Sequence, residues 1–115
     1  MTSKELVKIA YNALDEKKGI NISVIDISEI SVIADYFIVV GGNNENQVKA
    51  LANNVEEKLY KAGVTPKHIE GYNNANWILM DFNDIVIHVF NEEERLFYDL
   101  ERIWRDGKQV DFSEL

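Results

Sequence analysis

Two apolar segments joined by a two-residue turn constrain the fold of this chain most strongly. Residues 76–82 and 85–90 are rich in β-branched and aromatic residues, and Asn83-Asp84 between them suits a hairpin turn. A two-residue turn fixes the register, so we expect Trp77 to lie opposite Phe90. One face of the hairpin is then wholly apolar and should pack beneath helices; it carries Ile78, Met80, Phe82, Ile85, Ile87 and Val89.

The opposite face of the predicted hairpin has a mixed character. It carries Trp77, Leu79, Asp81, Val86, His88 and Phe90. If helices cover only one face of the sheet, Trp77, Leu79 and Phe90 form an exposed apolar patch, which monomers rarely leave without a use. Tryptophan in such a patch is a typical anchor of a protein interface. The alternative is that the chain's C-terminal part partly buries Trp77, and the pattern alone favours neither.

The remaining periodicities predict the order α-β-β-α-β-β-β-α. The expected helices are 2–18, 45–62 and 91–105, and the expected strands are 22–27, 35–41, 68–72, 76–82 and 85–90. The continuous apolar run from Tyr36 to Val40 is typical of a central strand buried on both faces. We therefore expect one α/β domain over 1–107, a mixed five-stranded sheet with three helices largely on one face, followed by a polar C-terminal tail over 108–115.

Charge and composition restrict the partners of this chain. It has 115 residues, a formal net charge of −8 and no cysteine, so we expect no disulfide framework and no cysteine-bound zinc. An acidic chain is repelled by phosphate backbones and attracted to basic proteins, although acidity can also serve solubility alone. No apolar run approaches the ~20 residues that span a bilayer, and the acidic N-terminal segment differs from a targeting leader. We expect a cytoplasmic protein with no membrane contact.

The residues that could support catalysis are few. Gly41-Gly42 follows a strand and precedes a helix, a geometry that can hold a phosphate. The pair lacks the lysine of a P-loop, and Asp81 and Asp84 flank a turn instead of forming a magnesium-binding pair. For His88, a structural role is favoured over that of a base. We therefore expect no enzyme, no metal and no cofactor; the alternative is a divergent nucleotidyltransferase that binds nucleotide at Gly41-Gly42.

Six stretches together carry a more specific signal. They are Ile33-Ala34-Asp35-Tyr36-Phe37, Gln47-Val48-Lys49-Ala50-Leu51-Ala52, Glu70-Gly71-Tyr72, Trp77-Ile78-Leu79-Met80-Asp81, Ile87-His88-Val89-Phe90 and Arg95-x-Phe97-Tyr98-x-Leu100-Glu101-x-Ile103-Trp104. This combination, over residues 6–104, resembles the RsfS/Iojap family of ribosomal silencing factors. Where relatives often read Gly-Thr-Ser-x-Arg-Gln, this chain reads Gly42-Asn43-Asn44-Glu45-Asn46-Gln47. The missing arginine bears on the role of that loop and not on the binding face.

The resemblance implies a nucleotidyltransferase-like fold without the catalytic acids, and a translation repressor in place of an enzyme. It implies binding to the fourteenth protein of the large ribosomal subunit, where the small subunit docks. The factor would sterically block subunit joining and lower translation when nutrients are scarce. A role in ribosome biogenesis, through large-subunit assembly, is also implied, with little direct nucleic-acid contact.

The resemblance also implies a binding site for the ribosomal protein. Its residues would be Glu70, Trp77, Leu79, Asp81, His88, Tyr98, Asp99 and Leu100. Trp77 and Leu100 would be apolar anchors, although Leu100 also suits the inward face of the last helix. Glu70, Asp81 and Asp99 would meet basic side chains, while Tyr98 and His88 would fix orientation. The competing use of the same face is a homodimer interface.

Overall fold

The computed structural model describes residues 1–93 and 107–115, and within them it forms one α/β unit with a mixed sheet. The strands are β1 (Ile20–Asp26), β2 (Tyr36–Gly42), β3 (His68–Glu70), β4 (Trp77–Asp81), β5 (Ile85–Asn91) and β6 (Lys108–Val110), in the spatial order β3-β4-β5-β2-β1-β6. Of the five pairings between described strands, only that of β2 with β5 is parallel, and the other four are antiparallel. The predicted class, one α/β domain with a mixed sheet, is confirmed.

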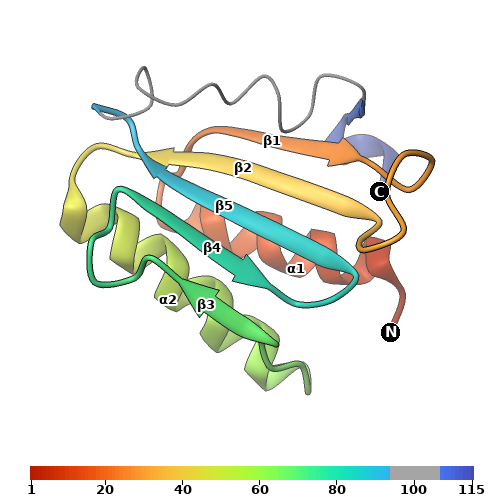
Figure 1. Cartoon of the computed structure of the whole chain (residues 1–115), viewed down its shortest axis with the longest axis horizontal. Coiled ribbons are helices and arrows are strands. Elements are labelled where there is room, and N and C mark those ends of the chain that lie inside the picture. The colour runs from red at the N-terminus through yellow and green to blue at the C-terminus, as the bar shows by residue number, and fades with distance from the viewer. Residues whose placement is uncertain (94–106) are drawn as a thin grey trace.

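Two α-helices, α1 (Ser3–Glu16) and α2 (Glu45–Lys61), lie on the same side of the sheet (Figure 1). Each begins where a polar side chain caps it: Thr2 Oγ1 accepts from the Glu5 amide at 3.2 Å, and Asn44 Oδ1 from the Gln47 amide at 2.9 Å. The main core fills the space between helices and sheet and includes all six residues of the predicted apolar hairpin face. Among the described residues, neither helix is both long and apolar enough to cross a membrane.

The hairpin has the register that its turn predicted. Trp77 pairs with Phe90, and Leu79 pairs with His88. Asn83 adopts the left-handed conformation at φ 72°, and its amide donates to Asp81 Oδ1 at 2.8 Å. An asparagine tolerates this conformation better than most residues, which is why the chain can reverse within two residues here.

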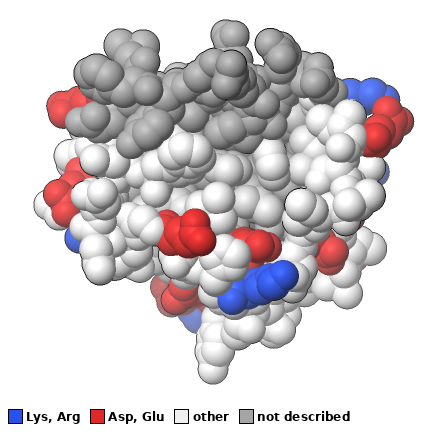
Figure 2. Space-filling model, in the orientation of Figure 1, with Lys and Arg blue, Asp and Glu red and all other residues white. Residues whose placement is uncertain are grey.

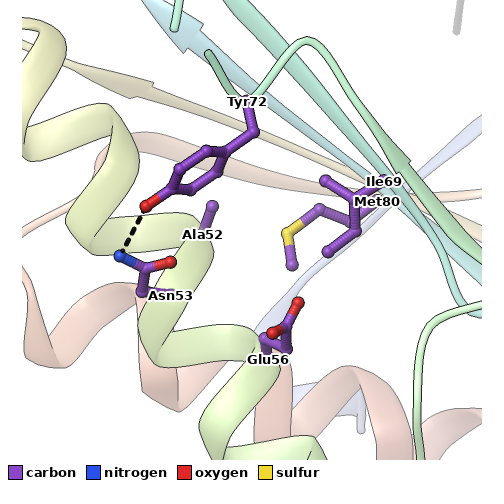
Figure 3. A pocket seen from close by; sticks show the side chains of 6 residues that line it. All are labelled: Ala52, Asn53, Glu56, Ile69, Tyr72 and Met80. Carbon is purple, nitrogen blue, oxygen red and sulfur yellow. Dashed lines mark hydrogen bonds between the residues drawn. The ribbon is translucent and has the colours of Figure 1, made fainter.

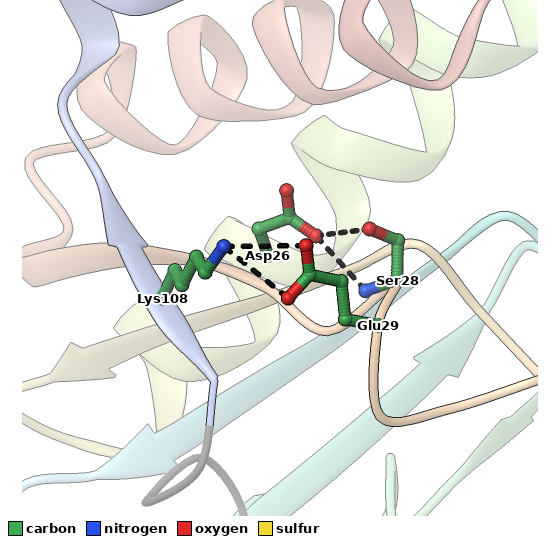
Figure 4. Close-up of polar contacts among 4 residues, drawn as sticks. All are labelled: Asp26, Ser28, Glu29 and Lys108. Atoms are coloured by element: carbon green, nitrogen blue, oxygen red, sulfur yellow. Dashed lines mark hydrogen bonds and ion pairs between the residues drawn. The ribbon is translucent and has the colours of Figure 1, made fainter.

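The prediction of five strands is wrong, because a sixth strand lies within the predicted C-terminal tail, 108–115. Lys108–Val110 forms a sixth strand, β6, antiparallel to β1, and a short 3₁₀ helix, η2 (Phe112–Glu114), follows it. The Phe112 ring stacks on Tyr11 at 4.4 Å between ring centres, which holds the C-terminal residues against α1. Lys108 Nζ also lies 3.2 Å from a carboxylate oxygen of Glu29 in the β1–β2 loop (Figure 4).

The third predicted helix, 91–105, cannot be compared over most of its length, because residues 94–106 lie outside the described residues. Its predicted first residue, Asn91, is the last residue of β5. The described part of the chain therefore has six strands and two α-helices, where five strands and three helices were expected.

Candidate functional site

The strand pleat brings five of the predicted site residues to one face of the sheet, opposite α1 and α2, which we call the outer face. Glu70, Leu79 and His88 lie opposite one another across β3, β4 and β5. Trp77 and Asp81 lie two positions before and after Leu79 on β4, so they point to the same side. This shared face follows directly from the confirmed hairpin register.

Trp77 is the central aromatic residue of the outer face. Its indole Nε1–H donates to His88 Nδ1 at 3.1 Å, and its ring centre lies 5.1 Å from that of Phe90. The side chain is half-buried, as is that of Leu79. A shallow depression of about 310 Å³ is lined by Glu70, Gly71, Trp77 and Leu79. The outer face thus offers a fixed aromatic ring beside an aliphatic side chain and a carboxylate.

His88 supports Trp77 from beneath the surface. Only 4% of the residue is exposed, and this burial lowers the pKa of the imidazole to about 4. The ring is therefore neutral at pH 7. Because Nδ1 accepts from Trp77, the proton sits on Nε2, which has no hydrogen-bond partner among the described residues. The ring edge also meets Phe37, with the ring centres 5.0 Å apart.

The exposed apolar patch is smaller than the sequence pattern suggested. Val86, His88 and Phe90 are buried, and Val86 and Phe90 belong to a second apolar cluster with Ile25 and Val39 on the outer face. Trp77 and Leu79 pack partly against this cluster and are the half-buried members from the hairpin. The expectation that Phe90 contributes to an exposed patch is therefore wrong.

Acidic side chains border Trp77 and Leu79 on the β3 side. His68 lies between two of the predicted acids, with Nε2 3.5 Å from Glu70 Oε1 and Nδ1 3.9 Å from Asp81 Oδ2. Figure 2 shows this side of the molecule: the described atoms are mostly uncharged, with scattered acidic groups and no continuous basic patch. We use the name outer surface for the four partly or fully exposed predicted site residues of the outer face, which are Glu70, Trp77, Leu79 and Asp81.

The Gly41-Gly42 pair does not form an open phosphate cradle. Both glycines belong to β2 and pair with Phe90 and Asn91 of β5. A Cβ on Gly41 would collide with the Glu92 carboxylate, so an acidic group already occupies this place. The amide of Asn43, just before the helix cap, donates to Gln47 Oε1 at 2.6 Å, and the Gln47 amide donates to Asn44 Oδ1, so these amides are already paired within the chain. No group of three or more His, Asp or Glu residues in the described ranges could hold a metal ion.

The loop that departs from the family pattern has a structural role that the sequence did not reveal. Gln47 Nε2 donates to the carbonyl oxygens of Lys17 and Lys18 at 3.3 and 3.1 Å, which ties the start of α2 to the end of α1.

The remaining predicted site residues, Tyr98, Asp99 and Leu100, lie outside the described residues.

Comparison with known proteins agrees with the resemblance seen in the sequence. A family model described as "Ribosomal silencing factor during starvation" matches residues 1–115. The ribosomal silencing factor RsfS of Halalkalibacterium halodurans is 40% identical over 113 residues, 98% of this chain and 97% of that protein. The RsfS of Bacillus subtilis is 39% identical over 113 residues, covering 98% and 96% of the two chains. A crystal structure of a Chromobacterium violaceum protein matches with a TM-score of 0.87 at 38% identity, covering 98% of this chain and 93% of that one. This chain belongs to the ribosomal silencing factor family.

Proposed function

We propose that this protein binds the large ribosomal subunit through the fourteenth ribosomal protein of that subunit and sterically blocks small-subunit joining. Translation would then be repressed under nutrient limitation, and a second role in large-subunit assembly is compatible with the same contact. Membership of the family supports a regulatory protein acting on the ribosome and not an enzyme. The likeness to a nucleotidyltransferase fold remains a prediction from the sequence.

The observation that carries this proposal is the outer surface itself. Trp77 and Leu79 are half-buried on an otherwise tightly packed face, and the hydrogen bond to His88 holds the indole in one orientation. A rigid aromatic side chain loses little conformational freedom on binding, which is why tryptophan often dominates an interface. His88 itself is too deeply buried to touch a partner, so within this proposal it is a positioning residue.

Electrostatics favour a basic protein over ribosomal RNA as the direct contact. The chain has a formal net charge of −8, and Glu70 and Asp81 border the apolar centre of the outer surface. Carboxylates at the rim of an interface steer association with a basic partner, while the same charge repels phosphate. Tyr98, Asp99 and Leu100 complete the proposed site on grounds of the sequence resemblance alone.

A subunit-joining assay tests the blocking step. Purified small and large subunits are mixed with the protein, and joined ribosomes are followed by light scattering. We expect the wild type to lower the joined fraction, and Trp77→Glu and Leu79→Glu to lose this effect while keeping a folded circular dichroism spectrum. If the wild type binds large subunits and leaves joining unchanged, steric blocking is refuted.

Val32→Glu provides the matched control for this assay. Val32 is fully exposed in the β1–β2 loop, at the end of β2 where Tyr36 pairs with Ile85, whereas Trp77 pairs with Phe90 at the other end. Val32→Glu therefore introduces the same charge as Trp77→Glu, but at the opposite end of the strands. This variant should block subunit joining as the wild type does. Sedimentation of the free protein addresses the homodimer alternative: a dimer that Trp77→Glu converts to a monomer would assign the outer surface to self-association.

A further inference from the structure

A groove between α2 and the edge strand β3 lies on the helix side of the sheet, away from the outer surface. One part, of about 300 Å³, is lined by Ala52, Asn53, Glu56, Ile69, Tyr72 and Met80 (Figure 3). A second part, of about 460 Å³, shares Asn53 and Glu56 and extends along α2 past Tyr60 to Pro66. The two parts lie next to each other, since Asn53 and Glu56 line both.

The groove has an apolar floor and an aromatic end. Ala52 and Met80 are buried beneath it, and Ile69 closes one side. The Tyr72 hydroxyl accepts from Asn53 Nδ2 at 3.0 Å, which fixes the ring at the other end. These apolar walls suit the methylene stem of a long side chain. Lys49 Nζ already lies 5.5 Å from the centre of the Tyr72 ring, so that ring has a cation of this chain beside it.

Glu56 supplies the charged group of the groove. Figure 3 shows its carboxylate pointing from α2 toward Met80 and Ile69, and the residue is half-buried. No ion pair joins Glu56 to any lysine, arginine or histidine in the described residues. It is therefore an acidic group without a cation, placed above an apolar floor.

The lysines of α2 are already matched with other acids. Lys49 lies 3.3 Å from Glu45, Lys58 lies 3.8 Å from Glu16, and Lys61 lies 3.2 Å from Glu57. Glu56 is the acid of this helix that none of them neutralises. A positively charged side chain from a binding partner would give Glu56 an ion pair like those of the other acids of α2.

The edge of the sheet beside the groove suits an extended partner. Among the described strands, β3 is the last in the sheet order and pairs with β4 only. In a strand added to β3, the residue opposite Ile69 would point to the same side as Ile69, which is into the groove. A planar guanidinium can bind a carboxylate such as that of Glu56 through two parallel N–H groups, a geometry that an ammonium does not offer.

We infer that this groove binds an arginine side chain presented by an extended, basic segment of a partner protein. The charge of −8 favours such a segment and disfavours nucleic acid. Because Ile69 points into the groove and its neighbours His68 and Glu70 point to the outer face, β3 separates this surface from the outer surface. The inference stands independently of the ribosomal contact proposed above.

A pair of synthetic peptides tests the groove. The first has the sequence Thr-Val-Thr-Arg-Thr-Val-Thr, and the second replaces arginine by citrulline, which keeps the shape and removes the charge. Each is titrated into the ¹⁵N-labelled full chain, and amide shifts are followed by NMR. We expect saturable shifts at Glu56, Ile69 and Tyr72 with the arginine peptide, and binding about tenfold weaker with citrulline, as for the loss of a charge-assisted hydrogen bond.

Two variants locate the interaction. Glu56→Gln should weaken binding of the arginine peptide by about tenfold. The control Glu29→Gln should change it less than about twofold, because Glu29 lies in the β1–β2 loop, away from the groove, and is exposed and paired with Lys108. Equal affinity for both peptides, unchanged affinity in Glu56→Gln, or shifts confined to Trp77 and Leu79 would each overturn the inference. The absence of any saturable shift would overturn it as well.

Discussion

Acidification should destabilise this protein through His88. Burial lowers the pKa of His88 from 6.5 to about 4, so between these values the unfolded chain binds a proton that the folded chain excludes. The stability that depends on His88 is therefore fully present above its pKa in the unfolded chain. It falls as the pH is lowered toward its pKa in the folded protein. One pKa unit corresponds to about 1.4 kcal/mol, so the lowered pKa of His88 is worth about 3 kcal/mol of folding free energy. About 2.5 kcal/mol of this stability is lost by pH ~4.5.

Urea unfolding followed by far-ultraviolet circular dichroism measures this loss. The free energy of unfolding is determined at about pH 7.5, 6.5, 5.5 and 4.5 for the wild type, His88→Gln and His68→Gln. The amide of His88→Gln can still accept from the Trp77 indole but cannot take up a proton, so its stability should depend less on pH by about 2.5 kcal/mol over this range. The control His68→Gln removes the other histidine of the chain, with 47% of its side chain accessible, and the loss of stability assigned to His88 should persist in it.

Parallel pH profiles for the wild type and His88→Gln would refute this reasoning. Asp26 does not contribute to the change between about pH 6.5 and 4.5. Hydrogen bonds from Ser28 hold the pKa of its carboxyl below 3.8. The stability that Asp26 contributes is therefore present above that value and is lost only at lower pH. A loss between about pH 6.5 and 4.5 that survives in His88→Gln would have to come from another group.

Three further changes test the packing by the same unfolding measurement. Met80→Ala should lose about 2–5 kcal/mol, because Met80 is fully buried in the main core; a loss below about 1 kcal/mol would contradict this packing. Gly71→Ala should lose about 1–3 kcal/mol, because Gly71 has φ +79° and a Cβ there would collide with the Trp77 carbonyl. Truncation after residue 107 should lose about 2 kcal/mol or more, because Val110 and Leu115 pack against the main core. An unchanged stability in that truncation would support the polar tail expected from the sequence.

The hairpin could be predicted from sequence because local and long-range signals agree there. Asn83-Asp84 allows a two-residue reversal, and this turn leaves a single register in which Ile78 and Met80 share a face with their apolar partners on β5. A shift by one residue would place polar side chains in the main core, so the pattern and the turn chemistry specify the same pairing. The positions of Trp77 and Leu79 on the outer face followed from that register.

The sequence could not predict features that depend on distant neighbours. β6 has only three residues, and its Lys108 and Gln109 are exposed, so no apolar periodicity marks it as a strand. The burial of His88 likewise depends on tertiary packing over the outer face. The alternation of side chains along a strand predicts the face on which His88 lies, but not how deeply that face is buried. Gly41-Gly42 resembled an open turn because the filling of that place by Glu92, fifty residues further along the chain, is a tertiary contact.

Co-sedimentation with purified large ribosomal subunits tests the central proposal most directly. The wild type, Trp77→Glu and the control Val32→Glu are each centrifuged with the subunits, after circular dichroism has established that each is folded. We predict that the wild type and Val32→Glu pellet with the subunits while Trp77→Glu remains in the supernatant. Equal pelleting of all three would place the ribosome contact away from the outer surface, and a wild type that stays in the supernatant would contradict ribosome binding itself.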